Sequence, residues 1–129
     1  MADYTKVNLD RDVENSAASF GIEGLEVHFA RAPLGMEQHG VTLFRFGPGQ
    51  RTPFGHKHVD QEEVYTVISG SARIKVEDEV VELEQWDAVH VLGDAMRCIE
   101  GGPDGAEILA SGAAAGRETS TIVQGWWSD

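Results

Sequence analysis

The sequence predicts an all-β protein that folds as a single domain. From Leu25 onward, short segments of alternating apolar and polar residues follow one another, and glycines separate many of them. No window of ordinary helix length combines the 3.6-residue period with capping residues. At 129 residues the chain has the usual length of one domain and can bury a sizeable core. Many short strands separated by turns are typical of a β-sandwich or a closed barrel.

Acidic residues dominate the charge, with 22 Asp and Glu against 10 Lys and Arg and a formal net charge of −12. Such a charge repels nucleic acid backbones and anionic membrane surfaces, so we expect neither as a partner. The single Cys98 cannot form an intramolecular disulfide, which suits a reducing compartment. The N-terminus lacks the pattern of a secretory signal and no apolar run is long enough to span a bilayer, so the sequence predicts a cytoplasmic protein.

The first half of the chain is expected to hold a polar arm followed by strands. The arm is weakly patterned, with a short strand near Thr5–Leu9 and at most one helical turn within Asp10–Ala18. Val41–Phe46 is a clear strand that places Phe44 and Phe46 on one face. On such a face, aromatic residues more often belong to the core than to a platform for substrate.

Glycines are expected to separate the strands in the second half of the chain. Gly70 is interpreted as a turn between strands Glu63–Ser69 and Ala72–Val76, and the glycine-rich residues 101–105 as a loop. The remaining strands are expected at Glu79–Leu83, Ala88–Leu92, Arg97–Glu100 and Glu107–Ser111.

The residues most indicative of function lie between Gly49 and Gly70. His56 and His58 stand one residue apart, and Glu63 follows after a short polar link. Alternate side chains of a strand point to the same face, so the histidine pair brings two imidazoles to one place. A carboxylate from a neighbouring strand then completes a site for a metal ion or for acid–base chemistry.

This stretch resembles the first motif of the cupin superfamily. That motif reads glycine, five residues, H-x-H, three or four residues, glutamate, six residues and glycine. Here four residues separate His58 from Glu63 and six separate Glu63 from Gly70, while the leading glycine stands one residue too far away. Glu62 fits the shorter spacing to the histidines but leaves seven residues before Gly70, so Glu63 is the better match.

The second cupin motif is recognisable by position in Trp86–Arg97. The family pattern is a G-D strand, a P-x-G turn and a metal-binding histidine; this segment keeps the length but lacks both glycines and the proline. Arg97 stands where the histidine ligand would be. The resemblance covers roughly residues 40–111 and implies a small jelly-roll β-barrel, commonly dimeric, with its site in the barrel mouth. It divides the chain into an N-terminal arm (1–24), a barrel (25–111) and a tail (112–129).

The resemblance implies a metal-ligand set of His56, His58 and Glu63, suited to Fe, Mn, Ni or Zn. Arg97 opposes a metal, because a guanidinium repels a divalent cation and readily pairs with a carboxylate. It therefore either replaces the ion beside Glu63 or binds an anionic group of a substrate. Tyr65 shares the strand face of Glu63 and is a second candidate for substrate binding, unless it simply fills the core.

The C-terminal residues are expected to return to the barrel. Gly112–Ser120 is small and polar, as in a flexible connection, whereas Trp126 and Trp127 are costly to leave in water. These tryptophans are expected to pack on the barrel or on a dimer partner.

Two classes of function remain open. The first is a cupin-like protein that binds a small polar or anionic molecule in its barrel, as a metal-dependent oxygenase or isomerase if it is an enzyme. The second is a metal-free, non-catalytic binding or interaction module whose metal site has decayed. In both cases we expect a homodimer with a small-molecule ligand.

Overall fold

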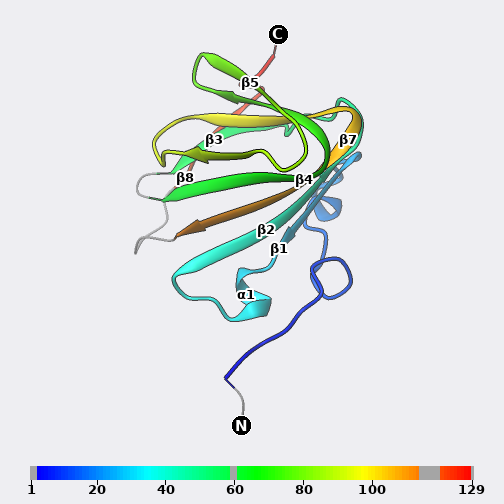
Figure 1. The fold of residues 1–129 in the computed structure, drawn as a ribbon, viewed down its shortest axis with the longest axis vertical. Coiled ribbons are helices and arrows are strands. Elements are labelled where there is room, and N and C mark those ends of the chain that lie inside the picture. The colour runs from blue at the N-terminus through cyan, green and yellow to red at the C-terminus, as the bar shows by residue number, and fades with distance from the viewer. Residues whose placement is uncertain (1–2, 59–60, 114–119, 129) are drawn as a thin grey trace.

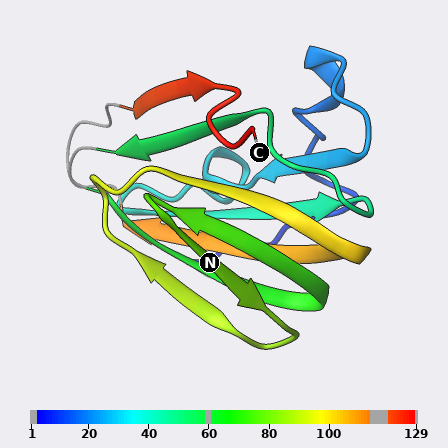
Figure 2. The same cartoon turned by 90° about the horizontal axis from the view of Figure 1, so that it is seen from above.

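The computed structural model describes residues 3–58, 61–113 and 120–128, and it confirms the all-β fold. Within these ranges eight strands form one curled sheet (Figures 1 and 2). A 3₁₀ turn (Ala18–Phe20) and a four-residue helix α1 (Arg31–Leu34) are the helical elements of the described chain. The strands are β1 (Leu25–Phe29), β2 (His39–Phe46), β3 (Phe54–His58), β4 (Glu62–Val76), β5 (Glu79–Leu83), β6 (Ala88–Val91), β7 (Arg97–Ala113) and β8 (Ser120–Gln124).

The long antiparallel strands β4 and β7 organise the sheet. The other edge of β4 pairs with β6 near its start and with β5 near its end. β7 also pairs with β2 and, at Arg97, with β3, so that the sheet continues in the order β1-β2-β7-β3-β8. The inward faces of these strands supply the core, in which Tyr65, Val67, Ile74 and Ile108 are almost fully buried.

β4 and β7 are each continuous, so the predicted turn at Gly70 and the predicted loop at residues 101–105 are wrong. β4 passes through Gly70 with two register shifts against β7, and both Gly70 (φ 75°) and Gly105 (φ 79°) adopt left-handed backbone conformations. An added Cβ at Gly70 would collide with the backbone of Gly105. The two glycines therefore permit a bulge where the paired strands bend together, which is another common role of glycine in sheets.

The predicted strand at Thr5–Leu9 is also absent from the described arm. Asn8 instead accepts hydrogen bonds from the backbone N–H groups of Asp10 and Arg11, at 3.0 and 2.9 Å, and this favours a turn. Further along the arm, Asn15 accepts a bond from the Val27 N–H at 2.9 Å and ties the arm to β1.

Phe46 confirms the core interpretation, since only 4% of its surface is exposed. Phe44 packs against the core and also lines a cavity. No helix in the described ranges is both long and apolar enough to cross a membrane.

The C-terminal tail lies against the barrel. β8 pairs with β3 from Phe54 to His58, while residues 114–119 of the expected flexible connection lie outside the described residues. Trp127 is only 5% exposed, and its ring is 4.1 Å from the Arg51 guanidinium carbon and 5.1 Å from that of Arg73. Arg51 also donates a 2.6 Å hydrogen bond to the Trp127 carbonyl.

Trp127→Leu is expected to lower the free energy of unfolding by about 2–4 kcal/mol, because it removes a buried ring and two cation–π contacts. Urea denaturation followed by circular dichroism measures the change. Trp126→Leu is the matched control; Trp126 is half-buried beside Lys75, so its loss is expected to cost clearly less. Equal costs for the two variants would contradict a specific role for Trp127.

Arg45 connects the arm to the sheet. It donates to Glu107 at 2.8 Å and to Asp10 at 2.7 Å, and it lies 3.3 Å from Glu26. The hydrogen bond from Arg45, followed by that from Ser69, lowers the pKa of Glu107 from its usual 4.5. The Arg45–Glu107 pair therefore stabilises the fold at pH values above 4.5. This stabilisation is lost as the pH falls through the lower pKa that Glu107 has in the folded protein.

Arg45→Met is accordingly expected to cost about 1 kcal/mol at pH 7, since the partners are partly exposed, and progressively less below about pH 4.5. Urea titrations of both proteins between pH 7 and pH 3 measure this difference. Arg11→Met removes an exposed arginine of the arm and serves as control. A cost that does not change with pH would contradict the pairing.

Candidate functional site

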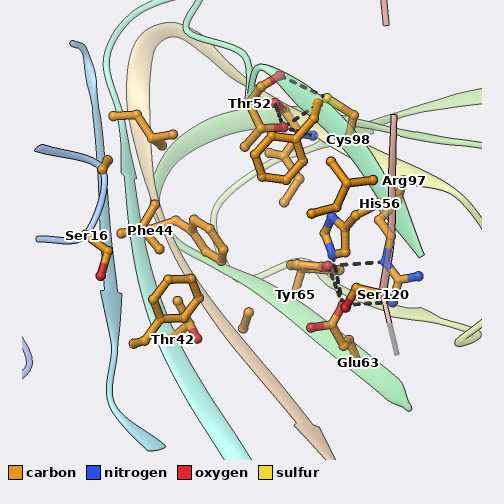
Figure 3. Close-up of a pocket in the computed structure, with 18 of the residues that line it drawn as sticks. Ser16, Thr42, Phe44, Thr52, His56, Glu63, Tyr65, Arg97, Cys98 and Ser120 are labelled. Carbon is orange, nitrogen blue, oxygen red and sulfur yellow. Dashed lines mark hydrogen bonds and ion pairs between the residues drawn. The ribbon is translucent and has the colours of Figure 1, made fainter. Parts of the chain in front are cut away.

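The candidate site lies where β3, β4 and β7 meet. His56 and His58 come from β3, Glu63 and Tyr65 from the start of β4, and Arg97 from the start of β7 (Figure 3). The structure brings all five sequence-predicted site residues together. The imidazole centroids are 5.2 Å apart and the rings are nearly perpendicular, at 80°.

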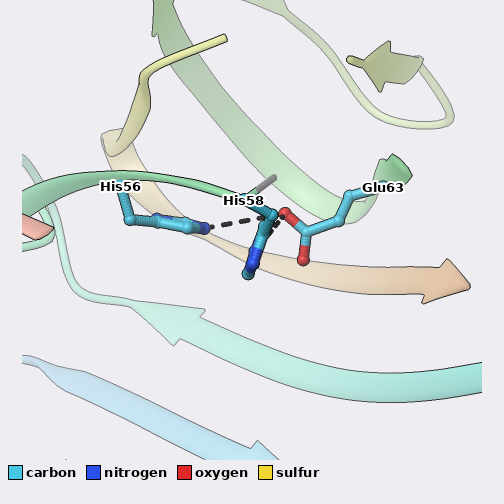
Figure 4. Close-up of side chains that lie close together, drawn as sticks. All are labelled: His56, His58 and Glu63. Carbon is cyan, nitrogen blue, oxygen red and sulfur yellow. Dashed lines mark ion pairs between the residues drawn. The ribbon is translucent and has the colours of Figure 1, made fainter. Parts of the chain in front are cut away.

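The Glu63 carboxylate is the centre of this group. Its Oε1 accepts hydrogen bonds from Tyr65 Oη at 2.6 Å and Arg97 Nη2 at 2.8 Å. The Nε2 atoms of His58 and His56 lie 3.5 and 3.6 Å from the same oxygen (Figure 4). One carboxylate oxygen therefore faces four side chains.

This environment keeps Glu63 charged. Burial acts to raise its pKa, but the contacts with His56 and His58, the Tyr65 hydrogen bond and the charge of Arg97 together hold the pKa well below its usual range. Burial, and next the negative charge of Glu63, raise the pKa of Tyr65. Tyr65 therefore remains a neutral phenol that donates to the carboxylate.

Arg97 supports the site from behind Glu63. The side chain is fully buried, and its guanidinium donates to the carbonyls of Ala95 at 2.7 Å and Gly93 at 3.1 Å as well as to Glu63. The predicted pairing with Glu63 is thus present. The alternative role of Arg97 as a receptor for an anionic substrate is not supported by this geometry, because the guanidinium is committed to the protein. The next residue, Cys98, contacts the Thr52 hydroxyl at 2.9 Å and not the carboxylate.

Sequence reasoning missed two polar residues of the site. Ser120, from β8, places its Oγ 3.2 Å from His58 Nδ1, the ring nitrogen opposite the one that faces Glu63. Gln61 lines the same cavity two residues before Glu63. Gln61 lies just before β4, so strand alternation does not select it, and no local pattern connects Ser120 with a histidine 62 residues earlier.

His56, His58 and Glu63 fit a divalent metal ion. Each offers one ligand atom, and these three atoms lie within 4.8 Å of one another. Two imidazole nitrogens and a carboxylate oxygen are a donor set for Zn, Fe, Mn or Ni. Tyr65 and Arg97, which already bind Oε1, would then orient the carboxylate ligand and offset part of its charge.

The three candidate ligands line one end of a partly open cavity of about 380 Å³ in the barrel. Figure 3 shows His56, Glu63, Tyr65 and Arg97 on one side of this space, with Thr42, Phe44 and Ser16 across it. The remaining wall is mainly apolar. The arrangement therefore combines one polar end with a hydrophobic interior, as small-molecule sites commonly do.

Solved structures of cupins share this architecture. A sugar phosphate isomerase of the cupin superfamily from Silicibacter pomeroyi superposes with a TM-score of 0.72 at 21% identity, over 89% of this chain and 79% of that one. A cupin protein from Bacteroides fragilis gives a TM-score of 0.72 at 24% identity, over 90% and 88% of the two chains. The chain has the cupin fold.

A mutant oxalate decarboxylase from Bacillus subtilis shares the cupin fold as well, with a TM-score of 0.74 at 20% identity. The match covers 96% of this chain but 33% of the decarboxylase. No protein-family model and no curated protein matches the sequence. At these identities the likeness establishes the jelly-roll barrel, while the function depends on the residues inside it.

Replacing Arg97 tests whether a side chain at position 97 lies close enough to the candidate metal ligands to act as one of them. Arg97→His is expected to raise Zn²⁺ affinity at least tenfold, because it removes a positive charge and adds an imidazole opposite His56 in the strand pairing. Arg97→Gln removes the charge without adding this ligand, so a smaller increase is expected. Competition with a chromogenic zinc chelator measures all three proteins, after circular dichroism confirms their fold. Equal affinities would contradict the match of Arg97 to the cupin histidine.

Proposed function

We propose that the chain binds a small molecule inside the cupin barrel, beside a divalent metal ion held by His56, His58 and Glu63. The convergence of three metal-ligating atoms at the polar end of an otherwise apolar cavity is the observation that carries this proposal. A metal ion bound there supplies a Lewis acid and a template for the substrate.

The surrounding side chains maintain the groups that this function needs. The Tyr65 and Arg97 hydrogen bonds fix the Glu63 carboxylate. Despite burial, the contacts with His56 and His58, followed by the Tyr65 hydrogen bond and the charge of Arg97, hold its pKa low and keep it deprotonated. Ser120, at 3.2 Å from Nδ1, orients the His58 ring so that Nε2 faces the carboxylate. The apolar wall lowers the local dielectric constant and so strengthens electrostatic interactions at the polar end.

The cupin fold alone does not identify the reaction. The named cupins include an isomerase and a decarboxylase, and the residues described here suit isomerisation of a carbonyl compound or an oxygenase reaction. If no metal is bound, Glu63 or one of the two histidines is the candidate for moving a proton. A homodimer and a cytoplasmic location remain predictions of the sequence.

A metal-free binding module is the second candidate, and the Glu63–Arg97 pair favours it. At 2.8 Å, the guanidinium neutralises the carboxylate without any further cation. Tyr65 occupies the same oxygen at 2.6 Å. In this version the histidines serve as hydrogen-bonding groups for the ligand and the protein performs no reaction.

Metal analysis of untagged protein, purified without chelator or added metal, separates the two candidates. Inductively coupled plasma mass spectrometry is expected to find close to one equivalent of a transition metal per chain. The amount should fall at least tenfold in the His56→Ala/Glu63→Ala variant, which lacks two of the three ligands. His90→Ala is the matched control, since His90 is a half-exposed histidine on β6 beside Glu62.

Wild-type protein that is free of metal and does not take up Fe, Mn, Ni or Zn on incubation would reject the metal-dependent function. The binding module would then be the remaining candidate. Metal that persists in the double variant would place the ion elsewhere in the chain.

A further inference from the structure

We propose that the cavity selects a small, mainly apolar molecule with a single polar end, and that Gln61 recognises a hydroxyl group at that end. The proposal rests on the function proposed above and adds the class of ligand. It departs from the small polar or anionic ligand expected from the sequence, and also from the sugar phosphate named for one of the similar structures.

The residues that line the cavity favour a ligand whose main part is apolar. Away from the polar end, the described wall is built from aromatic and branched aliphatic residues, so a sugar ring would leave several hydroxyl groups without partners. Figure 3 shows the hydroxyl side chains of Ser16 and Thr42 across the cavity from Glu63, and Thr52 and Ser120 also line it. The apolar lining includes Phe20, Ile22, Leu25, Val27, Phe29, Val41, Phe44, Phe54, Ile99 and Ile122.

The charges of the wall disfavour a phosphate group. Among the described lining residues, the cationic side chains other than histidine are Arg31 and Arg97. Arg31 donates to the carbonyls of Met36 and Glu37, at 3.3 and 2.6 Å. Arg97 is fully buried and donates to Glu63, Tyr65 and backbone carbonyls. Both guanidinium groups therefore already bind acceptors of the protein, which leaves less positive charge for a phosphate dianion in the cavity.

Gln61 supplies a specific contact at the polar end. Its Oε1 is buried and has no hydrogen-bond partner among residues 3–58, 61–113 and 120–128. A buried acceptor of this kind is costly unless a donor meets it, so a hydroxyl group on the ligand would be recognised there. The side chains of Gln61 and Glu63 both approach Gly112, so one end of a ligand can meet the amide and the histidine–glutamate group together.

A glycine on the neighbouring strand leaves room for the Gln61 side chain. Gly112 of β7 pairs with Glu63, and a Cβ added to it would stand 2.9 Å from Gln61 Nε2 and 3.0 Å from Glu63 Cγ. A larger residue would therefore push against both side chains. The absence of a side chain at Gly112 lets the amide and the carboxylate lie next to each other on one wall.

Phenol and anisole form a matched pair of probes, since they share a ring and only phenol carries a hydroxyl donor. Amide chemical shifts of ¹⁵N-labelled wild-type protein are expected to show phenol binding about tenfold more tightly than anisole. In Gln61→Met, which keeps the chain length, the two affinities should lie within about twofold of each other. Gln61→Leu gives a second test if the first variant does not fold. Ribose 5-phosphate should cause no shifts at the cavity.

The outcomes separate this inference from the proposed function. Shifts of cavity residues by ribose 5-phosphate and not by phenol would overturn the ligand class but leave small-molecule binding intact. A preference for phenol that survives in both variants would overturn the role of Gln61. If none of the three probes shifts the residues around His56, Glu63 and Phe44, the ligand class is overturned, while the metal analysis described above tests the proposed function independently.

Discussion

The Glu63 carboxylate is the constraint around which this barrel is arranged. It is largely buried and charged, and such a group is tolerated inside a protein only when it is paired and hydrogen-bonded. Arg97 and Tyr65 provide these bonds, and both are fully buried in consequence. Their positions require the start of β7 to lie beside β3 and β4, so one ionic group links the strands that build the polar end of the cavity.

A second set of contacts holds the opposite edge of that site. β8 extends the sheet beyond β3 and contributes Ser120 to the histidine pair, yet its own residues are exposed. The chain that follows is fixed by Trp127, whose ring contacts Arg51 and Arg73. Arg51 also donates two hydrogen bonds to one carboxylate oxygen of Glu100 on β7. The tail is therefore fastened to the barrel by side chains far from the cavity, and this anchoring keeps β8 against the histidine strand.

The sequence predicted the contents of the site better than the path of the chain. His56, His58 and Glu63 followed from strand alternation and a motif, which are local signals. Gly70 and the glycines of β7 were misread, because whether a glycine turns a chain or bends a strand depends on a partner strand that no local pattern reveals. Ser120 was missed for the same reason, as its contact joins residues that only the fold brings together.

Charge balance explains why the same residues suit two functions. The charges of Glu63 and Arg97 cancel each other. With neutral histidines, the polar end therefore has no net charge when no metal is bound and a net charge of +2 when a divalent ion is bound. A metal-bound site therefore gains from a ligand that brings negative charge through an ionisable hydroxyl, whereas a neutral site prefers an uncharged donor. A hydroxyl group on an apolar body meets both conditions, and a phosphate meets at most the first. The Gln61 oxygen accepts a hydrogen bond only from a hydroxyl group that keeps its proton, so it recognises the neutral form of such a ligand and not a hydroxyl group that has ionised beside a metal.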